Sequence, residues 1–151
     1  MQVQFYLLQE STNQQHEPAA MPAHVALVCQ LCADLYRANQ RVLLFCANQQ
    51  DAEQLDEVLW QFDAERFVPH NLAGEGPPRG APIEISWLPP KNSRQVLINL
   101  TATVPAFASR FSQIIEFVPV DEAGKAAARQ RFKHYRQHGI EPQTLPVPAL
   151  S

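Results

Sequence analysis

Apolar residues in the first half of the chain alternate between short continuous runs and longer stretches with a helical period. Residues 4–8 form an apolar and aromatic run, and residues 41–47 form a second one that predicts a strand covered on both faces. Residues 23–39, and a segment that begins at residue 48 or 49, place apolar side chains three and four positions apart, which predicts two helices. The order strand, helix, strand, helix is typical of an α/β domain with a mostly parallel sheet.

The second half predicts shorter elements. A loop rich in Gly and Pro is expected over residues 67–82, followed by strands at 83–87, 95–100 and 113–119 with a short helix at 105–112 before the last strand. A final helix is expected from Asp121 to His138, with Gly139 directly after its C-terminus.

The last residues differ from the rest of the chain. Residues 141–151 are rich in proline and lack periodicity, so we expect a Pro-rich flexible tail there. No repeat and no linker divides the preceding residues, and 151 residues fall within the range of one domain. The sequence therefore predicts a single α/β domain over residues 1–140.

Composition limits the function classes. The chain is 46% apolar and 18% charged, as in globular proteins, and no apolar run is long enough to cross a membrane. The first residues lack the basic segment of a signal peptide, so we expect a cytoplasmic protein without membrane contact. A formal net charge of −3 argues against a general nucleic-acid binder, which usually has a broad basic surface.

The final helix departs from this acidic balance, because it carries five basic residues against Asp121 and Glu122. Lys125, Arg129 and Lys133 are spaced four residues apart and share one helix face, a set we call the basic stripe, and we expect Arg136, three residues further on, to extend it. Phe132 lies beside it. A local cationic stripe with an apolar neighbour suits an acidic peptide. The helix dipole favours the same distribution of charge, so a solvated helix face is the alternative.

Two features invite a catalytic interpretation. Gly74, Gly76 and Gly80 resemble a phosphate loop, but their spacing differs from G-x-G-x-x-G and the loop leads into a strand rather than a helix. His70 has the chemistry of a general acid or base, but no nucleophile motif accompanies it. An α/β enzyme acting on a nucleotide or phosphoester through Gly74–Gly80 and His70 is therefore the alternative to a binding module.

The three cysteines point to no cofactor. An odd number without a regular framework argues against structural disulfides. Cys29 and Cys32 form a C-x-x-C pattern inside a predicted helix rather than at its N-terminus, where a thiolate would be stabilised. No second pair stands at the spacing of zinc ligands, so we expect neither a metal nor another cofactor.

Aromatic residues gather at the end of the second predicted helix and in the loop after it. Trp60, Phe62 and Phe67 are close in sequence. Such aromatics are often core residues, but Trp and Phe are also enriched at the centres of protein interfaces. Both interpretations remain open on the residues alone.

Five segments together resemble one known family, the chi subunits of bacterial DNA polymerase III holoenzymes. They are Phe-Tyr-Leu-Leu at 5–8, Leu-Asp-Glu-Val-Leu-Trp at 55–60, Phe-Val-Pro-His-Asn-Leu-Ala-Gly-Glu-Gly at 67–76, Gly-Ala-Pro-Ile-Glu-Ile at 80–85, and Phe-Val-Pro at 117–119 leading into the basic helix. The resemblance covers about residues 3–140, and the block at 67–76 is long and chemically unusual.

The resemblance implies a noncatalytic clamp-loader accessory with a three-layer α/β/α fold. A chi subunit forms a heterodimer with the psi subunit, reaches the clamp-loader complex through psi, grips the acidic C-terminal tail of single-stranded-DNA-binding protein, and contacts DNA only indirectly. The resemblance also implies that Lys125, Arg129 and Lys133 bind this tail and that Val118 and Phe132 line the pocket for its last aromatic residue. It further implies that Trp60 and Phe67 face psi.

Overall fold

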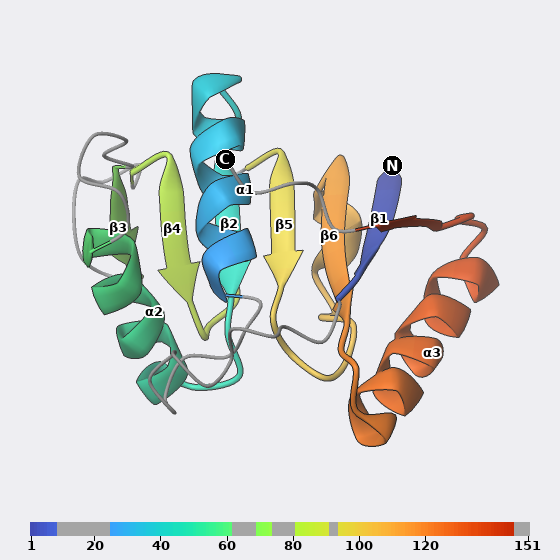
Figure 1. Cartoon of the computed structure of the whole chain (residues 1–151). Helices are drawn as coiled ribbons and strands as arrows, with labels where there is room; N and C mark the ends of the chain where they lie inside the picture. Colours follow the sequence, from blue (N-terminus) through green and yellow to red (C-terminus); the bar gives the residue numbers. More distant parts are fainter. Residues whose placement is uncertain (9–24, 62–68, 74–80, 91–93, 147–151) are drawn as a thin grey trace.

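The protein folds around one parallel sheet. The computed structural model describes residues 1–8, 25–61, 69–73, 81–90 and 94–146. In this part of the chain seven strands lie in the order β3-β4-β2-β5-β6-β1-β7, and every neighbouring pair is parallel (Figure 1). The strands are β1 (Gln2–Leu7), β2 (Val42–Phe45), β3 (His70–Leu72), β4 (Ile83–Ser86), β5 (Val96–Asn99), β6 (Gln113–Val118) and β7 (Gln143–Pro146).

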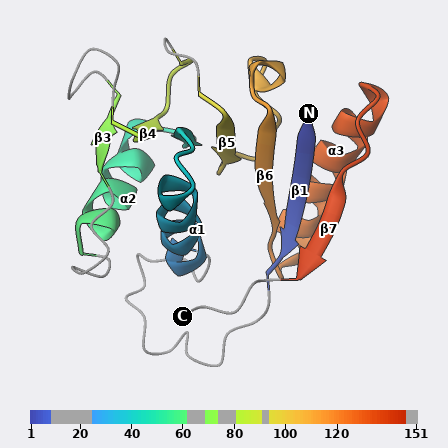
Figure 2. The same ribbon diagram turned by 90° about the horizontal axis from the view of Figure 1, so that it is seen from above.

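In the described residues, three α-helices connect strands: α1 (Val25–Arg37), α2 (Gln49–Gln61) and α3 (Glu122–Gln137). The connections through α1 and α2 move toward the β3 edge, whereas the connection from β6 through α3 to β7 moves toward the other edge. Because such connections are right-handed, opposite directions place the helices on opposite faces of the sheet. Figure 2 shows α2 beside β3 and α3 beside β1 and β7, at the two ends of the molecule.

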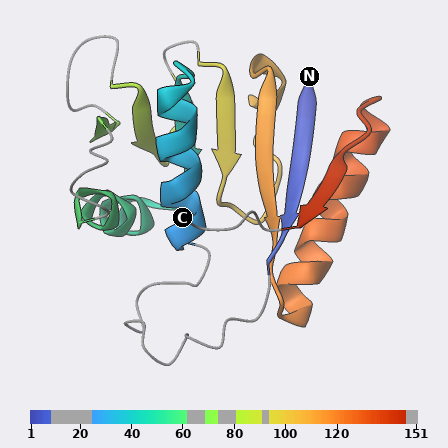
Figure 3. The ribbon, with the colours of Figure 1, turned by 45° about the horizontal axis from the view of Figure 1, so that its top comes forward.

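Each central strand contributes side chains to two separate cores. In β2, Leu44 packs with α1 and α2 while Leu43 packs on the α3 side. In β6, Ile115 and Ile114 divide in the same way. Successive side chains of a strand point to opposite faces of the sheet. A strand that is covered on both faces therefore needs apolar residues at consecutive positions, which explains the continuous apolar runs of the sequence. The predicted α/β fold with three layers and a parallel sheet is confirmed, and Figure 3 shows α1 lying over the middle of the sheet.

Two predictions of irregular structure are wrong in part. The loop expected at 67–82 contains β3, and the flexible tail expected from residue 141 begins with β7, which pairs with β1. Both strands are short and lie at the edges of the sheet, and β7 is mostly exposed. An edge strand needs little apolar alternation, so its sequence gives a weak signal. Residues 147–151 lie outside the described residues.

Smaller elements agree with the sequence to different extents. The helix expected at 105–112 is only a 3-10 turn, Ala108–Arg110, and Phe111 directly after it is buried. Gly139 has a φ of 80° directly after α3, which confirms the predicted C-terminal glycine. Within the described ranges, the helices are all too short or too polar to cross a membrane.

Candidate partner-binding site

The first turn of α3 is fixed closely against the end of β6. Asp121 caps the helix, and its Oδ2 accepts a hydrogen bond of 2.8 Å from the backbone N–H of Gly124. A Cβ atom at Gly124 would lie 2.6 Å from Cγ of Pro119 and 2.8 Å from Oδ1 of Asp121, so only glycine permits this approach. The sequence therefore anchors the start of α3 beside the Val118–Pro119 segment.

A buried charge fixes the next turns of α3. Glu116 of β6 is fully buried and accepts hydrogen bonds from Arg131 Nε at 2.9 Å, Tyr135 OH at 2.6 Å and Asn99 Nδ2 at 2.9 Å. Burial raises the pKa of Glu116, while Arg131 and the hydrogen bonds of Asn99 and Tyr135 oppose the shift. Burial and the neighbouring Glu116 also raise the pKa of Tyr135, so its hydroxyl stays a donor.

A pocket of about 210 Å³ opens between α3 and the sheet. One wall comes from α3 and the other from β1, β6 and β7; the lining residues are Phe5, Val118, Lys125, Ala128, Arg129, Phe132 and Thr144. The rings of Phe5 and Phe132, which both line it, lie 5.3 Å apart. We call this hollow the α3 pocket. Four of the five residues predicted for tail binding therefore line one cavity: Val118, Lys125, Arg129 and Phe132.

The cations beside this pocket differ in their surroundings. Arg129 and Lys133 are exposed and Lys125 is half-buried. Among the described residues, none of the three is paired with an acid. Lys133 belongs to the same helix but does not line the α3 pocket. Arg131 is buried with Glu116, and Arg136 lies 3.7 Å from Glu141, so neither adds to the basic stripe.

The opposite edge of the sheet displays an aromatic side chain. Trp60, at the end of α2, is 57% exposed and its ring lies 4.8 Å from that of His70 on β3. The His70 side chain is almost fully buried, and its Nε2 lies 3.2 Å from Oδ1 of Asp56 on α2. Phe67, which was predicted to join Trp60, lies outside the described residues, as do Gly74, Gly76 and Gly80.

These observations bear on the enzymatic alternative. A histidine held between Asp56 and Trp60 connects α2 to β3, and its buried side chain offers little room to a substrate. The three cysteines are buried, and burial raises the pKa of Cys29 and Cys46 to about 12, which disfavours thiolate chemistry. In the part of the chain that the structure describes, no group of three or more His, Cys, Asp or Glu side chains is placed to hold a metal ion.

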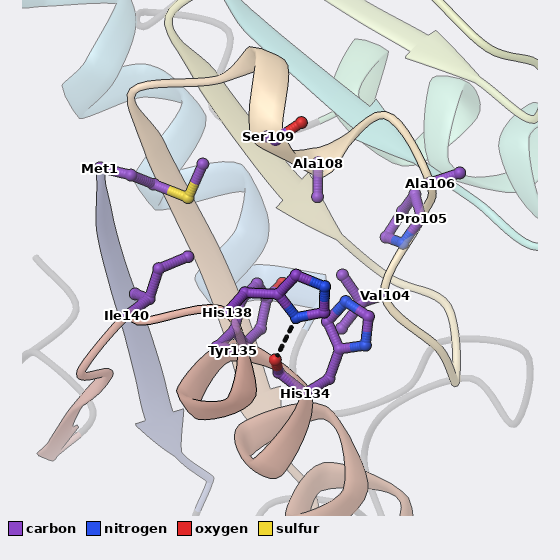
Figure 4. A pocket seen from close by; sticks show the side chains of 10 residues that line it. All are labelled: Met1, Val104, Pro105, Ala106, Ala108, Ser109, His134, Tyr135, His138 and Ile140. Atoms are coloured by element: carbon purple, nitrogen blue, oxygen red, sulfur yellow. Dashed lines mark hydrogen bonds between the residues drawn. The ribbon is translucent and has the colours of Figure 1, made fainter.

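A second pocket, of about 320 Å³, lies on the other flank of α3 near its C-terminus. Figure 4 shows the imidazole rings of His134 and His138 side by side there, 4.4 Å apart, with Nδ1 of His138 donating a hydrogen bond to the carbonyl of His134. The rest of its lining is largely apolar and includes Val104, Pro105 and Ile140. This pocket is separate from the basic stripe.

Sequence reasoning missed Glu116, Arg131, Phe5 and Thr144. The sequence did contain a signal for Glu116, which interrupts an apolar strand. A carboxylate buried in such a strand almost always has a partner, so a buried arginine or hydrogen-bond donor could have been predicted. Phe5 and Thr144 gave no such signal, because their place in the pocket depends on which strands flank β6 and β1.

Known proteins resemble this chain over nearly its whole length. A family model described as DNA polymerase III chi subunit, HolC, matches residues 1–143. The chain is 42% identical over 142 residues to the DNA polymerase III subunit chi of Escherichia coli, covering 93% of this chain and 94% of that protein. It is 44% identical over 138 residues to that of Haemophilus influenzae, covering 90% of each. It is 37% identical over 135 residues to that of Pseudomonas aeruginosa, covering 88% and 94%.

Proposed function

Because the chain belongs to the DNA polymerase III chi subunit family, and is thus an accessory replication subunit, we propose that it links the psi subunit to single-stranded-DNA-binding protein. In this proposal the acidic C-terminal tail of single-stranded-DNA-binding protein occupies the α3 pocket. The psi subunit covers the opposite edge, around Trp60 and Phe67, and connects the chain to the clamp loader. DNA is contacted only through these partners, and the subunit itself is noncatalytic.

The observation that carries the proposal is that basic side chains lie at the rim of an apolar pocket. Lys125 and Arg129 stand at the rim of a cavity whose inner surface includes Phe5, Val118 and Phe132. A peptide that ends in an aromatic residue presents a ring, a terminal carboxylate and acidic side chains close together. The apolar wall suits the ring, and the guanidinium of Arg129 suits a carboxylate because it donates two parallel hydrogen bonds.

The surface at Trp60 supports the second part of the proposal. A large, exposed aromatic side chain at the end of a helix is the kind of residue that contributes most to protein–protein affinity. Trp60 and the α3 pocket belong to opposite edges of the sheet, so both partners have room to bind at once.

A titration with a labelled acidic peptide ending in an aromatic residue tests the tail site. Arg129→Ala should weaken binding about tenfold or more, since hydrogen bonds to charged groups contribute about 1.5–3 kcal/mol. Arg129→Lys should recover only part of the loss, and Lys125→Ala and Lys133→Ala should cost less. Higher salt should weaken the wild type, because exposed charges are screened beyond about 8 Å at physiological ionic strength.

Arg136→Ala is the matched control, because Arg136 is an exposed arginine of the same helix that pairs with Glu141 outside the pocket. It should bind the peptide like the wild type. If Arg129→Ala also binds like the wild type, the tail site lies elsewhere and the basic stripe is a solvated helix face.

A further inference from the structure

The α3 pocket has walls from two elements that must be held in one relative position. Lys125, Ala128, Arg129 and Phe132 come from α3, while Phe5, Val118 and Thr144 come from three different strands. A small rotation or shift of α3 on the sheet would change the distance between Phe132 and the strand wall, and with it the width of the cavity. The shape of the site therefore depends on whatever fixes α3 in register.

Glu116 is placed to fix the register of α3, because its hydrogen-bond partners lie next to residues of both walls of the α3 pocket. Two of its three donors, Arg131 and Tyr135, lie one turn apart on α3 on either side of Phe132. Arg131 also donates a hydrogen bond of 2.9 Å to the carbonyl of Phe117, the residue directly before Val118. The same carboxylate thus connects the helix wall and the strand wall.

The chemistry of this contact is more restrictive than apolar packing. A buried carboxylate is costly unless its oxygens are paired with donors in good geometry. Apolar side chains tolerate small shifts, whereas turning α3 by one residue would remove the donors of Arg131 and Tyr135 from Glu116. The ring of Phe5 packs against Phe132 at 5.3 Å and Tyr135 at 6.0 Å, so the same register also shapes the apolar surface of the pocket.

We infer that Glu116 is a positioning residue of the tail site, which sets the register of α3 so that the α3 pocket accepts the terminal aromatic residue. The inference rests on the proposed tail binding. Glu116 does not touch the peptide. It acts through Arg131 and Tyr135 on Phe132 and, through the backbone of Phe117, on Val118.

The test compares Glu116→Gln with Glu84→Gln. Glu84 is, among the described residues, a second buried glutamate paired with a buried arginine, Arg94 at 3.6 Å, and it lies on β4, away from α3. Both variants should lower the melting temperature. Only Glu116→Gln should weaken binding of the aromatic-ended peptide, by about fivefold or more, which is within the range for residues that act on a site indirectly.

A second peptide ending in alanine separates positioning from general destabilisation. It lacks the ring but keeps the acidic residues, so it reports the cations alone. Glu116→Gln should bind it like the wild type, and should lose much of the wild type's preference for the aromatic end. Equal weakening of both peptides, in proportion to the unfolded fraction, would mean that Glu116 serves stability only.

Tyr135→Phe keeps the test decisive if Glu116→Gln does not fold. It removes one donor to Glu116 with almost no change in volume, and should reduce the same preference by about twofold to threefold. If Arg129→Ala weakens binding but both the Glu116 and Tyr135 variants keep the full preference, the positioning role is wrong and the tail site stands. If the wild type shows no preference for an aromatic end, the proposed function itself fails.

Discussion

At one edge of the sheet, α3 and β7 enclose a pocket flanked by cations that pair with no acid in the described part of the chain. At the other edge, α2 and β3 display a tryptophan that contacts a buried histidine. The first edge is concave and charged, which suits the end of a flexible acidic chain. The second presents a protruding aromatic ring, which suits a folded partner with a pocket for it. Two edges of one sheet thus differ in the kind of partner they can hold.

The two edges also differ in how they are held together. Glu116 joins a strand to a helix through Arg131, so this ion pair fixes a helix that carries functional side chains. Glu84 of β4 pairs with Arg94, whose guanidinium also donates to the backbone carbonyls of Ala81 and Pro82, so these bonds join β4 to the segments directly before β4 and β5. In this comparison a buried charge can influence a binding site because its partners, Arg131 and Tyr135, lie on the same helix as residues of that site's wall.

The largest expected effect is on the stability of the α3 edge. Arg131→Met removes the cation and leaves Glu116 buried, which should lower the free energy of unfolding by about 3–5 kcal/mol. Arg136→Met breaks an ion pair in which both side chains are exposed, so it should change stability by about 1 kcal/mol or less. Urea denaturation measures both values. Similar effects of the two substitutions would show that the buried pair does not anchor α3.

The loss of stability in Arg131→Met should also depend on pH. Burial raises the pKa of Glu116 and Arg131 opposes this, so loss of Arg131 raises the pKa further. A carboxyl group whose pKa is higher in the folded state favours folding at low pH and loses this contribution as the pH rises. The destabilisation of Arg131→Met should therefore be smaller near about pH 5 than near about pH 8.

The next effect concerns the other edge. Trp60→Ala should weaken psi binding by about 2 kcal/mol or more, as for aromatic residues central to interfaces. It should change stability little, because more than half of the side chain is exposed. Tyr36→Ala, at a partly exposed tyrosine of α1, is the control for loss of a surface aromatic.

Arg129→Ala and Trp60→Ala together test whether the edges act independently. Calorimetry with each partner should show that the first variant loses only the acidic peptide and the second only psi. A variant that loses both partners would contradict the separation of the two surfaces.

The smallest expected effect concerns the start of α3. In an ordinary helix, Gly→Ala stabilises by about 1 kcal/mol. At Gly124 the new Cβ would meet Pro119, so we expect a loss of stability and a several-fold weaker peptide complex. Gly139→Ala is the matched control: its φ of 80° makes alanine unfavourable, but in the described residues no heavy atom beyond its chain neighbours lies within 4 Å of the new Cβ. Gly139→Ala should lower the melting temperature without changing peptide binding. If both variants bind the peptide equally well, the α3 pocket tolerates a shift of the first turn of α3.

The sequence by itself determined the layers of the fold and the helix face on which the basic residues of α3 lie. Apolar runs bounded by helical periods predict buried parallel strands, because a strand covered on both faces has few polar positions. The four-residue spacing of Lys125, Arg129 and Lys133 places them on one side of any helix they form. The family resemblance added Val118 and Phe132, and both line the α3 pocket with Lys125 and Arg129.

Only the tertiary structure decided what completes the site. Arg131 looks like another surface cation in the sequence, yet it is buried, because its direction depends on where α3 docks on β6. Phe5 and Thr144 reach the pocket because β1 lies between β6 and β7. Helical and strand periods are local and can be seen in a few consecutive residues. Strand order and helix register depend instead on contacts between separate elements: Arg131 and Glu116 are 15 residues apart, and Gln4 and Gln113 of the neighbouring strands β1 and β6 are 109 residues apart.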